Sequence, residues 1–383
     1  MPSNTKKTKV SITLLLTLSL ILLTFQVPLA KATEDSWTTK APMQQARADL
    51  GVAVVNGKIY TIGGSIGSGI GIVAGKTYAV VGSNGTQFVS TNEEYDPATD
   101  TWTFKASMPT PRCSFGIAVY QDKIYCIGGE LNNGSGTRVN EVYDPATDTW
   151  ETKAPMPRTN WALTANVVDG KIYLIGGVSS ANFAYDPLTD SWTTKASIPN
   201  PEGLYGCASV VVDDKIYLIG AFSDESFTLN QIYDPETDSW SFGSPTPSNV
   251  LYAAAGATTG LMAPKRIYVF GLTLLIGGGS VPPFANQVYD PENDGWTVGT
   301  SMPTSRINFG VAVVNDTIYA VGGDTHYMLG QIYPSAINEQ YTPVGYIPEF
   351  PSWTPLLIML IGVLVVTVIY KQKLKQNQRR DDQ

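Results

Sequence analysis

The chain has 383 residues, 43% of them hydrophobic, and a formal net charge of −8 at pH 7. Nine of its 25 Lys and Arg and two of its 33 acids lie near the two ends, so residues 33–370 carry a net charge near −15. An acidic field of this size disfavours nucleic acid and anionic lipid as partners.

The first 32 residues have the pattern of a secretory signal peptide. Lys6, Lys7 and Lys9 precede an apolar run from Val10 to Val27, and Ala30-Lys31-Ala32 follows as a small-x-small cleavage pattern. Basic residues, an apolar stretch and small residues in this order direct export. We therefore predict a signal peptide over residues 1–32, cut after about Ala32; the alternative is an uncleaved run that serves as a second membrane anchor.

A hairpin unit recurs after this segment. Residues 51–64 contain two β-rich runs joined by Asn56-Gly57, and Asn-Gly is a strong hairpin signal because both turn residues must accept positive φ. Five further copies end in a related Ile-Tyr-x-x-Gly stretch. The fifth copy has a longer connection, from about Thr258 to Lys265, in place of the short turn. The unit therefore predicts six antiparallel hairpins.

A second motif follows the hairpins and predicts a third and a fourth strand. Residues 95–102 read Tyr-Asp-Pro-Ala-Thr-Asp-Thr-Trp, and four related segments follow. The repeated aromatic residues, which we interpret as packing between sheets, are Tyr95, Tyr143, Tyr185, Tyr233, Tyr289, Trp37, Trp102, Trp150, Trp192, Trp240 and Trp296. With successive Trp 42 to 65 residues apart, the units resemble kelch repeats, whose period is about 50 residues. The resemblance covers residues 35–341 and implies an all-β fold, a six-bladed kelch β-propeller.

The two ends of the repeat array complement each other. Asp35 to Met43 has the form of a fourth strand with Trp37, but no first three strands precede it. The last copy supplies three strands and no Trp. The N-terminal strand is therefore predicted to complete the last blade of a propeller over residues 33–345, and this closure would remove the exposed sheet edges of an open stack.

The C-terminal region predicts a membrane anchor. Pro355 to Tyr370 is almost unbroken apolar sequence, flanked by Trp353 and a basic tail, so we expect a transmembrane helix over residues 354–370, with the tail 371–383 in the cytoplasm and the propeller outside. In the linker 346–353, Pro348-Glu349-Phe350 resembles sorting signals of archaeal surface proteins. That resemblance implies an archaeal cell surface and processing by an archaeosortase-type enzyme as the alternative to a retained helix.

One face of the predicted propeller gathers the candidate binding residues. In an antiparallel blade, the connections from strand two to three and from strand four to the next blade emerge on the same face, and binding residues concentrate on such loops. The candidates are Arg47, Arg112, Asn160, Tyr205, Arg306 and His326. The arginines would offer planar forks to a carboxylate, as the resemblance to kelch domains that bind acidic peptides also implies. The alternative is that each Arg pairs with an Asp of a neighbouring blade or with backbone carbonyls. The Gly-rich segment Ser65 to Gly85 is expected to form an extra hairpin over the mouth or a surface loop.

The sequence contains little that points to catalysis. One histidine cannot supply the His pair of a galactose-oxidase-type copper site, and no catalytic, metal or cofactor motif occurs. Resemblance to six-bladed sialic-acid mutarotases leaves open an enzyme on an acidic sugar, with Glu130 or Asp324 acting beside an arginine. Cys126 and Cys207 are predicted to be buried. Three glycosylation sequons begin at Asn84, Asn133 and Asn315.

Together these features predict an exported, membrane-tethered propeller at the cell surface. We expect it to bind an extracellular protein or glycan, as an adhesion module, through the loops around its channel. An acidic-sugar enzyme and a structural envelope component are the two alternatives.

Overall fold

The computed structural model describes residues 33–66, 70–73, 76–79, 87–199, 204, 206–220, 228–272, 285–325 and 333–347, together with the single positions 362, 367 and 371. The predicted signal peptide lies outside the described residues, as do the transmembrane helix and the tail apart from positions 362, 367 and 371, and as do Asn84, Tyr205 and His326. In the part of the chain that the structure describes, no helix has the length and apolarity needed to span a membrane.

Six four-stranded antiparallel sheets form the described fold, and we number them as blades 1 to 6. From the innermost strand outward, blade 1 has β2 (Gly51–Val55), β3 (Lys58–Ile62), β8 (Asn92–Asp96) and β9 (Thr101–Lys105); blade 2 has β10 (Gly116–Tyr120), β11 (Lys123–Ile127), β12 (Asn140–Asp144) and β13 (Thr149–Lys153); blade 3 has β14 (Leu163–Val168), β15 (Lys171–Gly176), β16 (Asn182–Asp186) and β17 (Ser191–Thr194); blade 4 has β18 (Ala208–Val212), β19 (Lys215–Ile219), β20 (Asn230–Asp234) and β21 (Ser239–Phe242); blade 5 has β22 (Leu251–Ala257), β23 (Ile267–Leu272), β24 (Asn286–Asp290) and β25 (Gly295–Gly299); blade 6 has β26 (Gly310–Val314), β27 (Thr317–Val321), β28 (Asn338–Thr342) and β1 (Ser36–Lys40).

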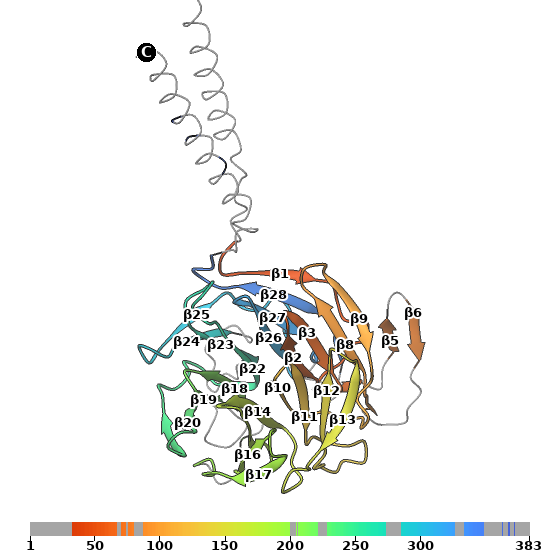
Figure 1. Cartoon of the computed structure of the whole chain (residues 1–383). Coiled ribbons are helices and arrows are strands. Elements are labelled where there is room, and N and C mark those ends of the chain that lie inside the picture. Colours follow the sequence, from red (N-terminus) through yellow and green to blue (C-terminus); the bar gives the residue numbers. More distant parts are fainter. Residues whose placement is uncertain are drawn as a thin grey trace, which may run out of the picture. The chain divides into compact units, whose positions relative to one another are not determined.

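The blades form a closed ring. The innermost strands contact one another in the order β2, β10, β14, β18, β22, β26 and back to β2, and Figure 1 shows the six sheets around one centre. The N-terminal strand β1 pairs with β28 in blade 6, with Trp37 opposite Tyr341. The predicted propeller, its six blades and its closure by the N-terminal strand are thus confirmed.

Turn chemistry explains why the inner hairpins form where they do. Asn56 and Gly57, which join β2 to β3, have φ of 50° and 73°. The short turns of blades 2, 3, 4 and 6 have positive φ at both positions too, and they are filled by Asn, Asp, Gln or Gly. Since a two-residue hairpin turn that follows the twist of its strands requires such angles, these residues fix the register of each inner pair.

The aromatic repeats pack and also bind the neighbouring blade. The ring of Trp150 lies 5.1 Å from that of Tyr143, and its Nε1 donates to the carbonyl of Ala106, which follows the outermost strand of blade 1. The amide of Ala106 donates to Oδ1 of Asp148, which also accepts from the Tyr143 hydroxyl. One Asp and one Trp therefore hold both backbone groups of a single residue in the adjacent blade.

This Asp–Trp clamp occurs at every junction between blades. The six pairs with the backbone residue that each holds are Asp100 and Trp102 with Ala41, Asp148 and Trp150 with Ala106, Asp190 and Trp192 with Ala154, Asp238 and Trp240 with Ala196, Asp294 and Trp296 with Ser244, and Asp35 and Trp37 with Thr300. The last pair lies in the N-terminal strand. The same interactions therefore close the ring and join its other blades.

The clamp predicts a loss of stability in acid. The pKa of Asp148 is lowered by the hydrogen bond from Tyr143 and then by the amide of Ala106, and the pKa values of the other five clamp aspartates are lowered too. A lowered pKa means that the fold prefers the ionised form, so this stability is complete above the usual aspartate pKa of about 3.9 and is lost as the pH falls below it. Urea titrations between pH 5 and pH 2 should show that loss, and Asp148→Asn should show a smaller one. An unfolding free energy that is independent of pH below 4 would contradict the clamp.

Candidate binding surface

The predicted binding loops do lie on one face, which we call the loop face. It consists of the connections between the second and third strands of each blade and those that lead from an outermost strand to the next blade. Single β-bridges join the two kinds of connection, between Ala48 and Ser65, between Cys113 and Glu130, and between Ile307 and Asp324. An inserted segment in blade 1 adds the pairs β4 (Ser65–Ile66) with β7 (Gln87–Phe88) and β5 (Ile70–Val73) with β6 (Lys76–Ala79), so the expected extra hairpin is present in the backbone.

Arg47 enters blade 1 from this face but offers nothing to a ligand. Its side chain is 0% exposed and forms a 2.8 Å ion pair with Glu93, which is 0% exposed too. The guanidinium also donates to the carbonyls of Gly63 and Thr91, each at 2.9 Å. Burial lowers the pKa of Arg47, while the charge of Glu93 opposes that shift. Its two terminal guanidinium nitrogens therefore hold the blade 1 connections together, whereas the buried Nε has no hydrogen-bond partner among the described residues.

Arg112 and Arg306 repeat this arrangement in blades 2 and 6. Arg112 pairs with Glu141, donates to the Cys126 carbonyl at 2.8 Å and lies over a phenylalanine ring. Arg306 pairs with Glu339 at 2.8 Å, and burial lowers its pKa to about 10. Both arginines are 0% exposed. The prediction that three free guanidinium forks face the mouth is therefore wrong, because a carboxylate on the third strand of the same blade already occupies each fork.

A signal for this pairing is present in the sequence. Blades 1, 2 and 6 have an Arg in the connection and a Glu two residues before the repeat tyrosine, namely Glu93, Glu141 and Glu339. Blades 3, 4 and 5 have no Arg at the position of Arg47, although Arg158 stands two residues before Asn160, and at the strand position of the glutamates they have Phe183, Gln231 and Gln287. At these two positions Arg and Glu thus occur together or not at all, as two halves of a buried pair must.

The remaining predicted site residues divide into one structural residue and two that are not described. Asn160 is 5% exposed; its Nδ2 donates to the Gly176 carbonyl at 2.8 Å, and its Oδ1 accepts from the amides of Trp161 and Val178. Asn160 therefore connects two loops of blade 3 in place of an arginine. Tyr205 and His326 lie outside the described residues, so their predicted role stays a prediction.

Six residues with positive φ encircle the loop-face end of the channel; five stand one or two residues before an innermost strand begins, and the sixth is the second residue of β22. We call them the mouth ring; they are Asp49, Ser114, Ala162, Gly206, Tyr252 and Asn308, with φ between 48° and 69°. The amide of Asp49 donates to the carbonyl of Asn308, that of Ser114 to Asp49, and that of Ala162 to Ser114. These bonds link consecutive blades, so the backbone of the mouth is fixed by the fold.

Asp49 is the charged member of the mouth ring. Burial in the channel wall raises its pKa to about 7, the hydrogen bond from Ser65 opposes the shift, and the charges of Asp324 and Glu130 add to it. Among the described residues no group of three or more His, Cys, Asp or Glu is placed to hold a metal ion.

Partly exposed aromatic side chains stand on the loop face, and the sequence analysis missed them. Trp161 and Tyr252 are partly exposed, and Tyr333 is 41% exposed. Trp161 is the tryptophan that follows Asn160, where the blades with arginine carry the smaller Ala48, Cys113 and Ile307. Trp161 does not stand at the repeat position where a Trp packs between blades, so packing does not explain its presence. That mismatch is the sequence signal that could have identified it.

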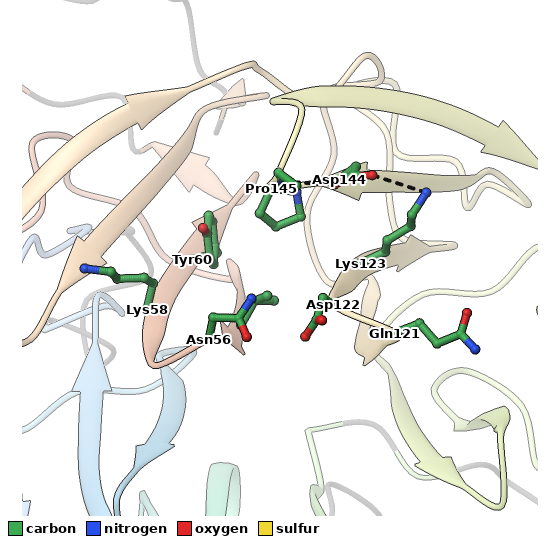
Figure 2. A pocket seen from close by; sticks show the side chains of 10 residues that line it. Asn56, Lys58, Tyr60, Gln121, Asp122, Lys123, Asp144 and Pro145 are labelled. Atoms are coloured by element: carbon green, nitrogen blue, oxygen red, sulfur yellow. Dashed lines mark hydrogen bonds and ion pairs between the residues drawn. The ribbon is translucent and has the colours of Figure 1, made fainter.

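Two hollows lie away from these aromatic residues. One, of about 270 Å³, lies in the channel between the innermost strands of blades 1 to 4 and is apolar except for Asn166. The other, of about 400 Å³, lies between the inner turns of blades 1 and 2, on the face opposite the loop face. Figure 2 shows Asn56 and Asp122 facing each other across this groove, with Lys123 paired to Asp144 at 3.3 Å. Lys58 is paired with Asp96 as well, so neither lysine of the groove lacks a counter-charge.

Comparison with known proteins identifies the repeat. The family model described as the KLHDC2/KLHL20/DRC7 Kelch-repeats domain matches residues 69–271, more than half of the chain. The chain belongs to the kelch-repeat family. A solved structure described as "Structure of YjhT" is similar to this kelch chain, with a TM-score of 0.58 and 18% sequence identity. The similarity covers 76% of this chain and 95% of that chain, and it shows the fold alone.

Curated relatives share shorter segments with this kelch protein. The Influenza virus NS1A-binding protein homolog of Mus musculus is 38% identical over 89 residues, which cover 23% of this chain and 11% of that protein. The F-box/kelch-repeat protein At1g67480 of Arabidopsis thaliana is 33% identical over 98 residues, 26% of this chain and 22% of that protein. The chain thus spans only a small part of each relative's length. The match shows that the kelch repeats are similar and says nothing about the activity of the whole relative.

Proposed function

We propose that this kelch propeller is an exported, membrane-tethered binding module that recognises a protein partner at the outer surface of a cell. Export and tethering rest on the sequence of the two termini, and archaeosortase-type processing remains the alternative to a retained helix. The binding role rests on the loop face. The single observation that carries it is that partly exposed aromatic side chains stand there on a backbone held by the mouth ring, with the hydrogen bonds of Asn160 beside Trp161 and the buried Arg306–Glu339 pair in the blade of Tyr333.

Rigid exposed aromatic residues favour binding of a protein. Tyr and Trp supply large contact areas at low cost in side-chain entropy, and they are enriched among the residues that dominate protein interfaces. Because the arginine forks of blades 1, 2 and 6 and the mouth-ring bonds already hold the backbone in place, little backbone conformational freedom is lost when a partner binds. The acidic surface, near −15 over residues 33–370, favours a partner with basic residues.

The acidic-sugar enzyme loses its main support. That alternative needs an arginine free to hold a carboxylate, and Arg112 and Arg306 are both buried and paired with glutamates. Arg47 is buried in the same way, so none of the three arginines predicted at the mouth is free; the exposed Arg138 and Arg158 of the loop face were not among the predicted site residues.

Site-specific photo-crosslinking tests the binding role. A photoreactive phenylalanine analogue placed at position 161 or 333 of the full chain, expressed in its own cells, should cross-link to the same protein from both positions. Position 104 is the matched control, because Phe104 is 53% exposed but lies on the outermost strand β9. Cross-links of equal yield at position 104, or none from either loop-face position, would contradict a binding role for the loop face and favour a structural envelope component.

A further inference from the structure

Blade 5 carries an ordered loop that the other blades lack. Between β22 and β23 the short turn is replaced by residues 258–266. The carboxylate of Asp316, 2% exposed in the turn of blade 6, accepts hydrogen bonds from the amides of Thr259, Met262 and Ala263 at 2.7 to 3.0 Å. A buried carboxylate thus holds this loop in one conformation.

The loop displays an apolar side chain next to the end of the propeller. Leu261 is 81% exposed, Val344 56% and Ile347 64%, and we call these three residues the exit patch. The amide of Ile347 donates to the carbonyl of Met262 at 2.6 Å, which fixes the C-terminal segment against the loop. Residues 257–264 and 342–348 contain no charged side chain, although the domain around them is strongly acidic.

Both apolar segments of the chain are attached beside this patch. The Glu34 carboxylate accepts from the Gly345 amide at 2.9 Å, so the first and the last described parts of the propeller touch. Residues 10–27 precede this contact in the sequence, and residues 355–370 follow it by ten residues. Ten extended residues span at most about 36 Å, so a membrane anchored by either segment lies within reach of the patch.

We propose that the exit patch rests on the lipid surface and fixes the orientation of the propeller against the membrane. This inference rests on the proposed membrane tether. Exposed apolar side chains without neighbouring charge enter the boundary between headgroups and acyl chains, whereas the acidic remainder of the domain favours water and zwitterionic rather than anionic lipid. The extra loop of blade 5 belongs to the face opposite the loop face, so contact through the patch leaves the mouth ring and its aromatic side chains accessible to a partner.

Lipid-borne quenching of a fluorescent label tests the patch. Full chain carrying Leu261→Cys is labelled with an environment-sensitive fluorophore and reconstituted into phosphatidylcholine vesicles that contain doxyl-labelled lipid. The native Cys113, Cys126 and Cys207 are buried and do not compete for the label. Leu188→Cys is the matched control, since Leu188 is 76% exposed in blade 3, the third blade from blade 6 in either direction around the ring.

We expect a blue-shifted emission and at least about threefold stronger quenching at position 261 than at position 188. A label at Ile347→Cys should behave like the one at position 261. If the chain floats with the vesicles but positions 261 and 188 are quenched equally, the patch proposal fails and the tether stands. If the full chain does not float with the vesicles at all, the tether and the patch proposal fail together.

Discussion

Replacing Glu93 with methionine should lower the free energy of unfolding by about 3 to 5 kcal/mol, because the change leaves the buried Arg47 charge without its partner. Arg47 and Glu93 are both 0% exposed, and their nitrogen and oxygen lie 2.8 Å apart. A guanidinium that remains in that position without a counter-charge has only the backbone carbonyls and the Thr61 hydroxyl to replace its lost hydration. Equilibrium unfolding in urea measures the loss.

Two comparisons make this prediction specific to the pair. Glu151→Met removes an acid of an outermost strand, 47% exposed, and should cost less than about 1 kcal/mol. The double variant Arg47→Met/Glu93→Met should be more stable than Glu93→Met alone, because no unpaired charge remains. Equal stability of Glu93→Met and Glu151→Met would show that Arg47 is not held as described, and would restore it as a ligand-binding residue.

Replacing Trp37 with alanine should cost about 3 to 5 kcal/mol, although this residue stands only five residues after the predicted cleavage site. Its ring packs against Phe270 and Tyr341 at 5.4 and 5.1 Å, and its Nε1 donates to the Thr300 carbonyl at 2.9 Å. Truncation therefore removes aromatic contacts and the clamp that joins blade 5 to blade 6. The measurement is again urea unfolding of the full chain.

The equivalent tryptophan of blade 3 provides the reference for this variant. Trp192 forms the same clamp, in a blade whose four strands are consecutive in the chain. If β1 is held in blade 6 as firmly as β17 is held in blade 3, Trp37→Ala and Trp192→Ala should lower the free energy of unfolding by similar amounts. A neutral Trp37→Ala beside a costly Trp192→Ala would mean that the ring is open at blade 6.

The fold could be predicted from the sequence because each of its determinants is local and recurs. The dipeptide Asn56-Gly57 alone indicates a turn. The spacing of Tyr and Trp in the second motif predicts the third and fourth strands and the residues that pack between blades. Closure followed from the unmatched strand around Trp37. The clamp was only half predicted: its tryptophans were interpreted as packing residues, but the bond from Asp148 to the neighbouring blade depends on how two sheets dock, which no single repeat reveals.

The binding surface was harder to predict, for two physical reasons. An arginine beside a channel has the same sequence appearance whether its fork is free or filled, and only the glutamate two strands away distinguishes them. The mouth ring depends on positive φ at residues as different as Asp49 and Tyr252, for which composition gives no signal. Trp161 lies outside the repeat motif, so the repeat pattern predicts no role for it.

Hydrogen exchange in the N-terminal strand is the most direct test of ring closure. The positions of the loop face and of the opposite face, which carries the exit patch, both depend on that closure. In the full chain, the amides of β1, Ser36–Lys40, that bond to β28 should exchange as slowly as the amides of the outermost strand β17 that bond to β16 in blade 3. Protection of β1 equal to that of β17 is the predicted result. Exchange of β1 within seconds, with β17 still protected, would contradict the closed ring and the positions of the loop face and the exit patch that follow from it.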